Sequence, residues 1–259
     1  MSACGGTPLL EVLDLVAVEA TGADRFVSTP RIGNGGRIGG SELLTSALLA
    51  CASSTRADLE PAGVQAMFLR SGRADAPVEL AVVHLQDSRT SAVRAVVATQ
   101  GGTTLMTATY RFVLSRPSVD WQPEFVFDVG PDEGVESMAA VSTMQALQCF
   151  DVRAAVHPAD GRPVIHPYWV KTKAPLPDDP LLHAALVLYL TDIGTTGSAR
   201  APGTRLRDRL GAVSLDHTFW WHRPVRGARG RCQPAGARRP ACPGDGWGPA
   251  DAAGATAAP

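Results

Sequence analysis

The chain has 259 residues, of which 45% are hydrophobic and 19% are charged, and its formal net charge is −1. This balance is typical of globular proteins, and it excludes the strong basic field that would attract nucleic acid or an anionic membrane. A chain of this length forms one large domain or two small ones.

The cysteines and the apolar runs indicate the compartment. Five cysteines are scattered without a Cys-x-x-Cys pair, which favours free thiols over a zinc site or a disulfide framework. No basic residue precedes Arg25, so a secretory signal is not expected. The longest strongly apolar run, residues 184–190, is too short to cross a bilayer. We therefore expect a soluble cytoplasmic protein without a membrane partner.

The first elements are an extended segment and a buried helix. Residues 9–15 fit a short helix or a short strand, and residues 25–32 read as extended chain. A glycine-rich loop over residues 33–40 leads to a helix over residues 42–54, with Ser41 as its expected N-cap. This helix is apolar on most of its faces, so we expect it to be buried.

Four antiparallel strands are predicted next, at residues 64–69, 78–86, 92–99 and 104–114. Gly101 and Gly102, between the last two strands, are typical of a hairpin turn. Residues 116–142 contain three prolines and are interpreted as a linker.

The same order of elements begins again after the linker. Strands are expected at residues 150–156 and 168–173, followed by an almost wholly apolar helix from its N-cap Asp179 to about Asp192. A strand over residues 213–223 comes next, so the two halves form a repeat at the level of the fold. Because a helix that is apolar on every face must be covered on all sides, we expect antiparallel strands to curve around each helix. We also expect the two sheets to join edge to edge.

The composition changes abruptly at Gly227. Residues 227–259 contain no Ile, Val, Leu, Met, Phe or Tyr and consist mostly of Ala, Gly, Pro and Arg. Such a segment cannot build a packed strand, so we expect a disordered tail and a truncated second unit. The predicted organisation is a first unit at residues 1–115, a linker at 116–142, an incomplete second unit at 143–226 and the tail at 227–259.

Six short stretches carry a family resemblance. They read GGRIGGSEL at residues 35–43, FLRSG at 68–72, LQDSRTS at 85–91, PDDP at 177–180, YLTD at 189–192 and SLDHTFWWHRP at 214–224. Over roughly residues 8–226 the chain resembles the type II, double-hotdog acyl-CoA thioesterases, and the last stretch together with Asp192 is the most specific part. The resemblance implies an α+β fold, the tandem (double) hotdog, in which antiparallel sheets each wrap a buried central helix.

The resemblance also implies an activity, the hydrolysis of an acyl-CoA to a free acid and CoA without a metal or a cofactor. In the family an Asp at the helix end, a Ser or Thr at the strand head and a Gln near the C-terminus hold the attacking water. Asp192 and Ser214 match the first two positions, and the third lies on a late strand that this chain lacks. Arg37 stands where the family commonly has Gln. Copies of the chain could assemble through their hotdog sheets.

The residues themselves leave alternatives open at both positions. Asp192 lies in the last turn of its helix, where the helix dipole and burial both disfavour its charge and would raise its basicity for general-base work on water. Alternatively, it is a turn residue that faces solvent before Gly194. Ser214 could hold the same water or be an ordinary strand serine. No serine lies in a G-x-S-x-G motif, so a covalent serine nucleophile is not expected.

The other motifs are interpreted as structural. His217 and His222 are five residues apart on a strand, which places them on opposite faces and argues against a shared metal ion. Hydrogen bonds within the sheet explain them better. The glycine-rich loop lacks the G-x-G-x-x-G spacing of a dinucleotide fold, although the resemblance implies that the following helix offers N–H groups to a thioester oxyanion. The arginines of the tail indicate a solvated segment rather than an RNA-binding one.

Two functional hypotheses follow. The first is an acyl-CoA thioesterase that uses a water activated by Asp192. The second is a non-catalytic acyl-CoA-binding or assembly protein, or an inactive, frameshifted thioesterase homologue. The frameshift hypothesis rests on the tail, because a GC-rich gene read out of frame yields Ala, Gly, Pro and Arg.

Overall fold

The computed structural model describes residues 17–30, 36–117, 119, 130, 150–154, 168–192, 213–225 and 248–249. The predictions for residues 9–15 and for Gly194 lie outside these ranges, and so does most of the linker. The expected loss of the last strands concerns residues 227–259, of which Gly248 and Pro249 alone are described, so it stays a prediction.

The first half folds as one antiparallel sheet around one helix. Its strands are β1 (Glu19–Gly22), β2 (Arg25–Ser28), β3 (Leu59–Phe68), β4 (Val78–Asp87), β5 (Ser91–Gln100) and β6 (Thr103–Leu114). The sheet order is β1-β2-β4-β5-β6-β3-β9, where β9 (Asp216–Trp220) comes from the second half. Gly101 and Gly102 join β5 to β6 with φ of 55° and 79°, the left-handed backbone that this hairpin requires. The predicted strands of the first half are confirmed.

Helix α2 (Gly40–Ser53) lies across the inner face of this sheet, and Leu44, Leu48 and Cys51 are fully buried. The prediction that Ser41 caps this helix is wrong. The helix begins at Gly40, and the N-cap is Gly39, whose backbone is extended with φ −71° and ψ 146°. Because glycine has no capping side chain, the Glu42 carboxylate turns back and accepts a hydrogen bond from the Gly39 N–H at 3.0 Å.

Helix α3 (Pro180–Thr191) begins as the sequence predicts. The Asp179 side chain caps it, because its Oδ1 accepts hydrogen bonds from the N–H groups of Leu181 and Leu182 at 2.9 and 3.3 Å. The helix is buried on nearly every face. A second sheet, of order β10-β8-β7, consists of β7 (Phe150–Ala154), β8 (Tyr168–Thr172) and β10 (Gly248–Pro249). The Tyr168 hydroxyl on β8 donates to the Leu190 carbonyl of α3 at 2.8 Å.

Strand β9 of the second half pairs with β3 at the edge of the first sheet. Because the described strands β7, β8 and β10 form a separate sheet, the edge-to-edge joining of the two sheets stays a prediction. Strands β3 and β9 are antiparallel, with Val64 opposite Phe219. Two further hydrogen bonds extend the pairing, from the Phe68 N–H to the Leu215 carbonyl at 2.8 Å and from the Trp221 N–H to the Ala62 carbonyl at 3.1 Å. These two hydrogen bonds are symmetric: Phe68 and Trp221 are the equivalent donors, and Leu215 and Ala62 are the equivalent acceptors. A local two-fold axis therefore relates β3 and its flanking residues to β9.

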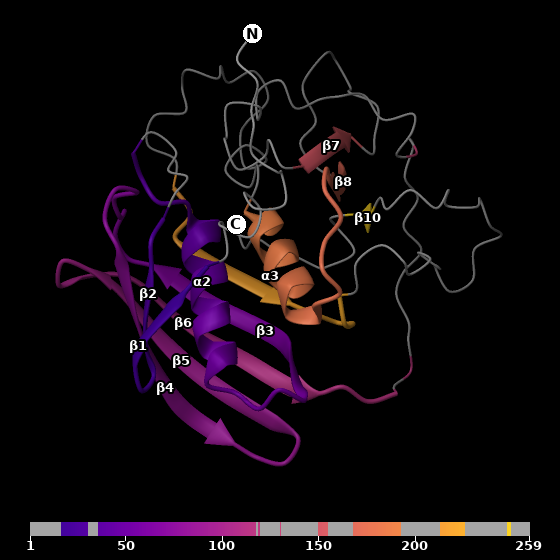
Figure 1. Ribbon diagram of the computed structural model, residues 1–259, viewed down its shortest axis with the longest axis horizontal. Helices are drawn as coiled ribbons and strands as arrows, with labels where there is room; N and C mark the ends of the chain where they lie inside the picture. The colour runs from indigo at the N-terminus through magenta and orange to yellow at the C-terminus, as the bar shows by residue number, and fades with distance from the viewer. Residues whose placement is uncertain are drawn as a thin grey trace, which may run out of the picture.

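Helices α2 and α3 pack side by side (Figure 1), in the arrangement that such an axis gives. They are antiparallel, because the C-terminal end of α3 contacts the N-terminal end of α2 and the N-terminal end of α3 lies beside the C-terminal end of α2. Neither described helix has the length and the apolar run that a bilayer crossing requires.

A buried arginine ties the other end of α2 to the sheet. Arg94 on β5 is 2% exposed. Its guanidinium donates to the Ser54 carbonyl after α2 at 3.0 Å, to the Gln86 carbonyl at 3.1 Å and to the Asp87 carboxylate at 2.6 Å. The hydrogen bond from Arg94 lowers the pKa of Asp87, although burial opposes the shift. Arg94 thus fixes α2 against the β4–β5 hairpin.

We predict that Arg94→Met lowers the free energy of unfolding by about 1–3 kcal/mol, because it removes the hydrogen bonds of a buried guanidinium to the part-buried Ser54 and Gln86 carbonyls. Arg56→Met is the matched control, since Arg56 pairs with Asp58 at the exposed surface. We expect that control to leave the urea midpoint unchanged. Equal midpoints for the two variants would contradict the anchoring role of Arg94.

Candidate active site

Asp192 lies where the two helices meet. It is the half-buried C-cap of α3, and its Oδ2 accepts a hydrogen bond at 3.0 Å from the Ser41 N–H in the first turn of α2. The positive end of the α2 dipole stabilises a carboxylate in its anionic form. The dipole of α3, which is the one apparent from the sequence around Asp192, acts in the opposite direction. The structure adds a second helix that favours the charge.

Gly40 makes this meeting possible. A Cβ atom at Gly40 would lie 3.1 Å from Asp192 Oδ2 and 2.9 Å from the Cζ atom of the Phe68 ring. A side chain at this position would therefore displace either the carboxylate or the ring. From the sequence, Gly40 is one residue of a glycine-rich loop and its contact with Asp192 is not predicted. The two glycines immediately before a buried helix are the pattern that indicates such a close contact.

Ser214 is half-buried and lies two residues before β9, rather than within the strand. Its neighbour Leu215 accepts the hydrogen bond from the Phe68 N–H, and the Phe68 ring packs on Gly40 beside Asp192. Phe68 therefore contacts both regions: its ring lies beside the end of α3 that carries Asp192, and its N–H binds the residue next to Ser214. Arg37, in contrast, is exposed and forms a β-bridge with Arg73.

His217 is a residue of this region whose partner the sequence analysis missed. It is 9% exposed, and its Nε2 lies 3.0 Å from Thr191 Oγ1 at the end of α3, so the prediction of a bond within the sheet is wrong. Burial lowers the pKa of His217, and the charge of Asp216 opposes this shift. His222 is exposed. Among the described residues, no three metal-ligating side chains gather into a group.

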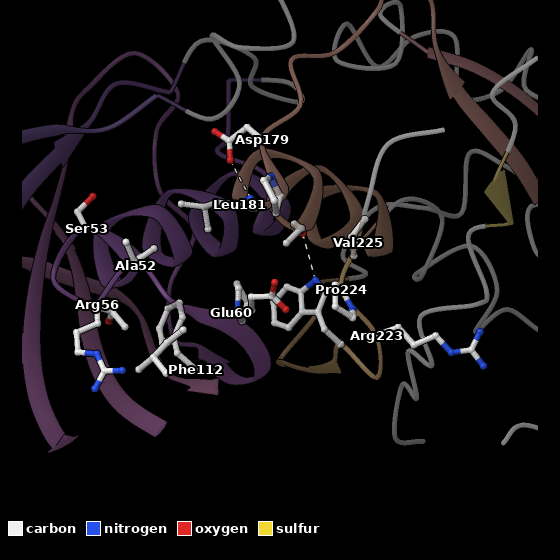
Figure 2. Close-up of a pocket in the computed structure, with 17 residues that line it drawn as sticks. Ala52, Ser53, Arg56, Glu60, Phe112, Asp179, Leu181, Arg223, Pro224 and Val225 are labelled. Atoms are coloured by element: carbon white, nitrogen blue, oxygen red, sulfur yellow. Dashed lines mark hydrogen bonds between the residues drawn. The ribbon is translucent and has the colours of Figure 1, made fainter. Parts of the chain in front are cut away.

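The opposite end of the helix pair holds a cavity of about 340 Å³ (Figure 2). The local two-fold axis relates this cavity to the Asp192 region. Counted from the N-caps of the two helices, Ala52 takes the position of Asp192. The symmetry that relates Ala62 to Leu215 relates Pro61 to Ser214. Asp179 caps its own helix here, as the hydrogen bond to Leu181 in Figure 2 shows. The acid and the hydroxyl are therefore present at one end of the helix pair and replaced at the other.

We predict that Gly40→Ala lowers the free energy of unfolding by about 1–3 kcal/mol, because the added methyl group overpacks the contact with Asp192 and Phe68. Gly22→Ala is the matched control, since a Cβ atom there would meet its nearest neighbour at 3.8 Å, an ordinary contact. Urea unfolding of both variants tests this. If the two substitutions lower the free energy of unfolding by the same amount, the close contact at Gly40 is refuted.

We also predict a pH dependence of stability. Because the folded-state pKa of His217 lies below 6.5, the unfolded chain binds its proton more readily than the folded one. The associated stability is complete above pH 6.5 and is lost as the pH falls through the folded-state pKa. We expect His217→Gln to reduce the loss of stability as the pH falls below 6.5, while His222→Gln keeps the parent profile. Parallel profiles for parent and His217→Gln would contradict this prediction.

Comparison with known proteins supports the same reading of both halves. Residues 141–229 match the family model described as acyl-CoA thioesterase, and residues 34–113 match the acyl-CoA thioesterase N-terminal domain. Acyl-coenzyme A thioesterase 8 of Homo sapiens is 23% identical over 215 residues, which cover 73% of this chain and 67% of that protein.

Solved structures resemble the whole described arrangement. The acyl-CoA thioesterase II TesB2 of Mycobacterium marinum is 22% identical, with a TM-score of 0.69 over 83% of this chain and 81% of that one, and shows the shared fold. The tesB protein of Mycobacterium avium subs. paratuberculosis is 32% identical, with a TM-score of 0.68 over 84% of this chain and 81% of that one. The family resemblance and the α+β hotdog fold expected from the sequence are confirmed. The chain belongs to the type II acyl-CoA thioesterase family.

Proposed function

We propose that the protein hydrolyses an acyl-CoA to a free acid and CoA by means of a water molecule that Asp192 activates. One observation carries this proposal: the hydrogen bond from the Ser41 N–H to Asp192 Oδ2 holds a half-buried carboxylate at the junction of the two halves. Family membership supports thioester hydrolysis as the reaction. The acid at the helix junction supplies the group that such a reaction needs.

Asp192 acts as the general base. The N-terminal end of α2 keeps its carboxylate anionic, and an anionic carboxylate in hydrogen-bonding reach of water accepts a proton as the water oxygen attacks. The Ser214 hydroxyl, which can donate and accept, holds the same water in line with the thioester carbon. We place this water near the Phe68 ring, around which the ends of α3 and β9 gather.

The reaction then proceeds in two steps. The water oxygen bonds to the carbonyl carbon, its proton passes to Asp192, and the carbonyl oxygen becomes an oxyanion. The C–S bond breaks as the carbonyl re-forms, and the CoA thiolate takes the proton back from Asp192. We assign the oxyanion to the N-terminal end of α2, where the Gly40 N–H makes no hydrogen bond to the described residues. These steps need only protein groups and water.

The alternative function is binding of acyl-CoA without hydrolysis. The cavity at the other end of the helix pair favours it in part, since Ala52 and Pro61 there replace the acid and the hydroxyl. Assembly of copies through their sheets is a further proposal, supported by the exposed side chains of Met67, Leu69 and Leu215 around the β3–β9 pairing.

We predict that Asp192→Asn lowers kcat by about 10²–10⁴-fold, the usual contribution of a general base. Ser214→Ala should lower kcat about 10-fold, the effect of losing one hydrogen bond. The measurement is release of the CoA thiol from short, medium and long acyl-CoAs, with folding checked by circular dichroism.

Asp179→Asn is the matched control for Asp192→Asn, because it makes the same chemical change at the opposite end of the same helix. Asparagine caps helices about as well as aspartate, so we expect the parent rate and the parent stability. Parent-like turnover by Asp192→Asn would refute the assigned base. A parent chain that binds acyl-CoA but releases no thiol would establish the binding alternative instead.

A further inference from the structure

One hydrogen bond connects the two segments that carry Asp192 and Ser214. His217 lies on β9, three residues after Ser214, and Thr191 immediately precedes Asp192 at the end of α3. The distance between His217 Nε2 and Thr191 Oγ1 is 3.0 Å, and both side chains are buried, at 9% and 8% exposed. The segment from Ser214 to His217 and the pair Thr191–Asp192 are thereby joined.

The direction of this hydrogen bond follows from the second contact of Thr191. A threonine hydroxyl has one proton, and Thr191 Oγ1 donates it to the Leu188 carbonyl at 2.7 Å. Thr191 Oγ1 must therefore accept from His217, so the imidazole carries its proton on Nε2. Burial, which lowers the pKa of His217, favours this neutral ring over the imidazolium.

Because of the neighbouring contacts, the hydrogen bond between His217 and Thr191 restrains the positions of both Asp192 and Ser214. On one side, the hydrogen bond to Leu188 fixes Thr191 to its own helix, and the Ser41 N–H holds the next residue, Asp192. On the other side, His217 is fixed in the sheet, where it pairs with Ala66 of β3. The imidazole is thus a rigid link between α3 and β9, and its removal would free the end of α3 to shift relative to Ser214.

We propose that His217 is a positioning residue of the thioesterase reaction, which sets the separation of the Asp192 carboxylate and the Ser214 hydroxyl through Thr191 without touching the substrate. This inference rests on the proposed function of Asp192. A misplacement of about 1 Å costs up to about 100-fold in rate when reacting groups must align. The link should therefore contribute to kcat and leave KM nearly unchanged, because it makes no contact with the bound acyl-CoA.

The test compares variants that keep or remove the link. His217→Leu keeps the bulk and removes the donor, and Thr191→Val keeps the shape and removes the acceptor. We expect each to lower kcat about 10- to 100-fold at nearly constant KM, and the double variant to be no worse than either single one. His217→Gln should restore most of the rate, since its Nε2 is as many bonds from Cα as that of histidine and can donate. Thr191→Ser should also retain activity.

His222→Leu is the matched control, because His222 is the exposed histidine of the same segment. The inference is overturned if His217→Leu and Thr191→Val keep the parent kcat, if their effects add, or if His217→Gln is as slow as His217→Leu. Should His217→Leu fail to fold, Thr191→Val and His217→Gln alone decide the question. Parent-like activity of Asp192→Asn, or no hydrolysis by the parent, would instead refute the proposed function and the inference with it.

Discussion

The pairing of β3 with β9 is the constraint on which the rest of the structure depends. It adds a strand of the second half to the sheet of the first and sets a local two-fold axis, beside which α2 and α3 run in opposite directions. The C-terminal end of one helix therefore meets the N-terminal end of the other. Asp192, which its own helix dipole disfavours as an anion, accepts a hydrogen bond from the first turn of the adjacent helix, whose dipole favours the charge.

The apolar interior and the polar chemistry occupy different parts of the same helices. Leu44, Leu48 and Leu188 in the helix centres have no exposed surface, and full burial of such side chains contributes about 1.5–3 kcal/mol each as an upper estimate. Polar groups collect at the helix ends, where backbone N–H and C=O groups have no partners within the helix. A wholly apolar helix is thus compatible with a reactive group, provided that the group lies at its end.

The elements that the sequence predicts correctly depend on local signals. Asp179 before Pro180 marks a helix start, and Gly101-Gly102 marks a hairpin, because neighbouring residues alone determine both. The bond between Ser41 and Asp192 joins residues that are 151 positions apart, so no local pattern could reveal it. The missed His217–Thr191 bond, between residues 26 positions apart, has the same origin. The wrong N-cap is instead a local error, because Glu42 accepts from the Gly39 N–H three residues before it. Family resemblance, rather than residue pattern, singled out Asp192 and Ser214.

The differences between the two helix-pair ends have a consequence for how such proteins diverge. Two identical subunits related by a two-fold axis must present the same residues at both ends of their interface. Covalent fusion into one polypeptide removes that obligation. Ala52 and Pro61 could then arise at one end while Asp192 and Ser214 persist at the other. If the proposed function holds, each polypeptide has one centre of turnover for two helix-pair ends, and the residues at the other end are no longer tied to the reaction.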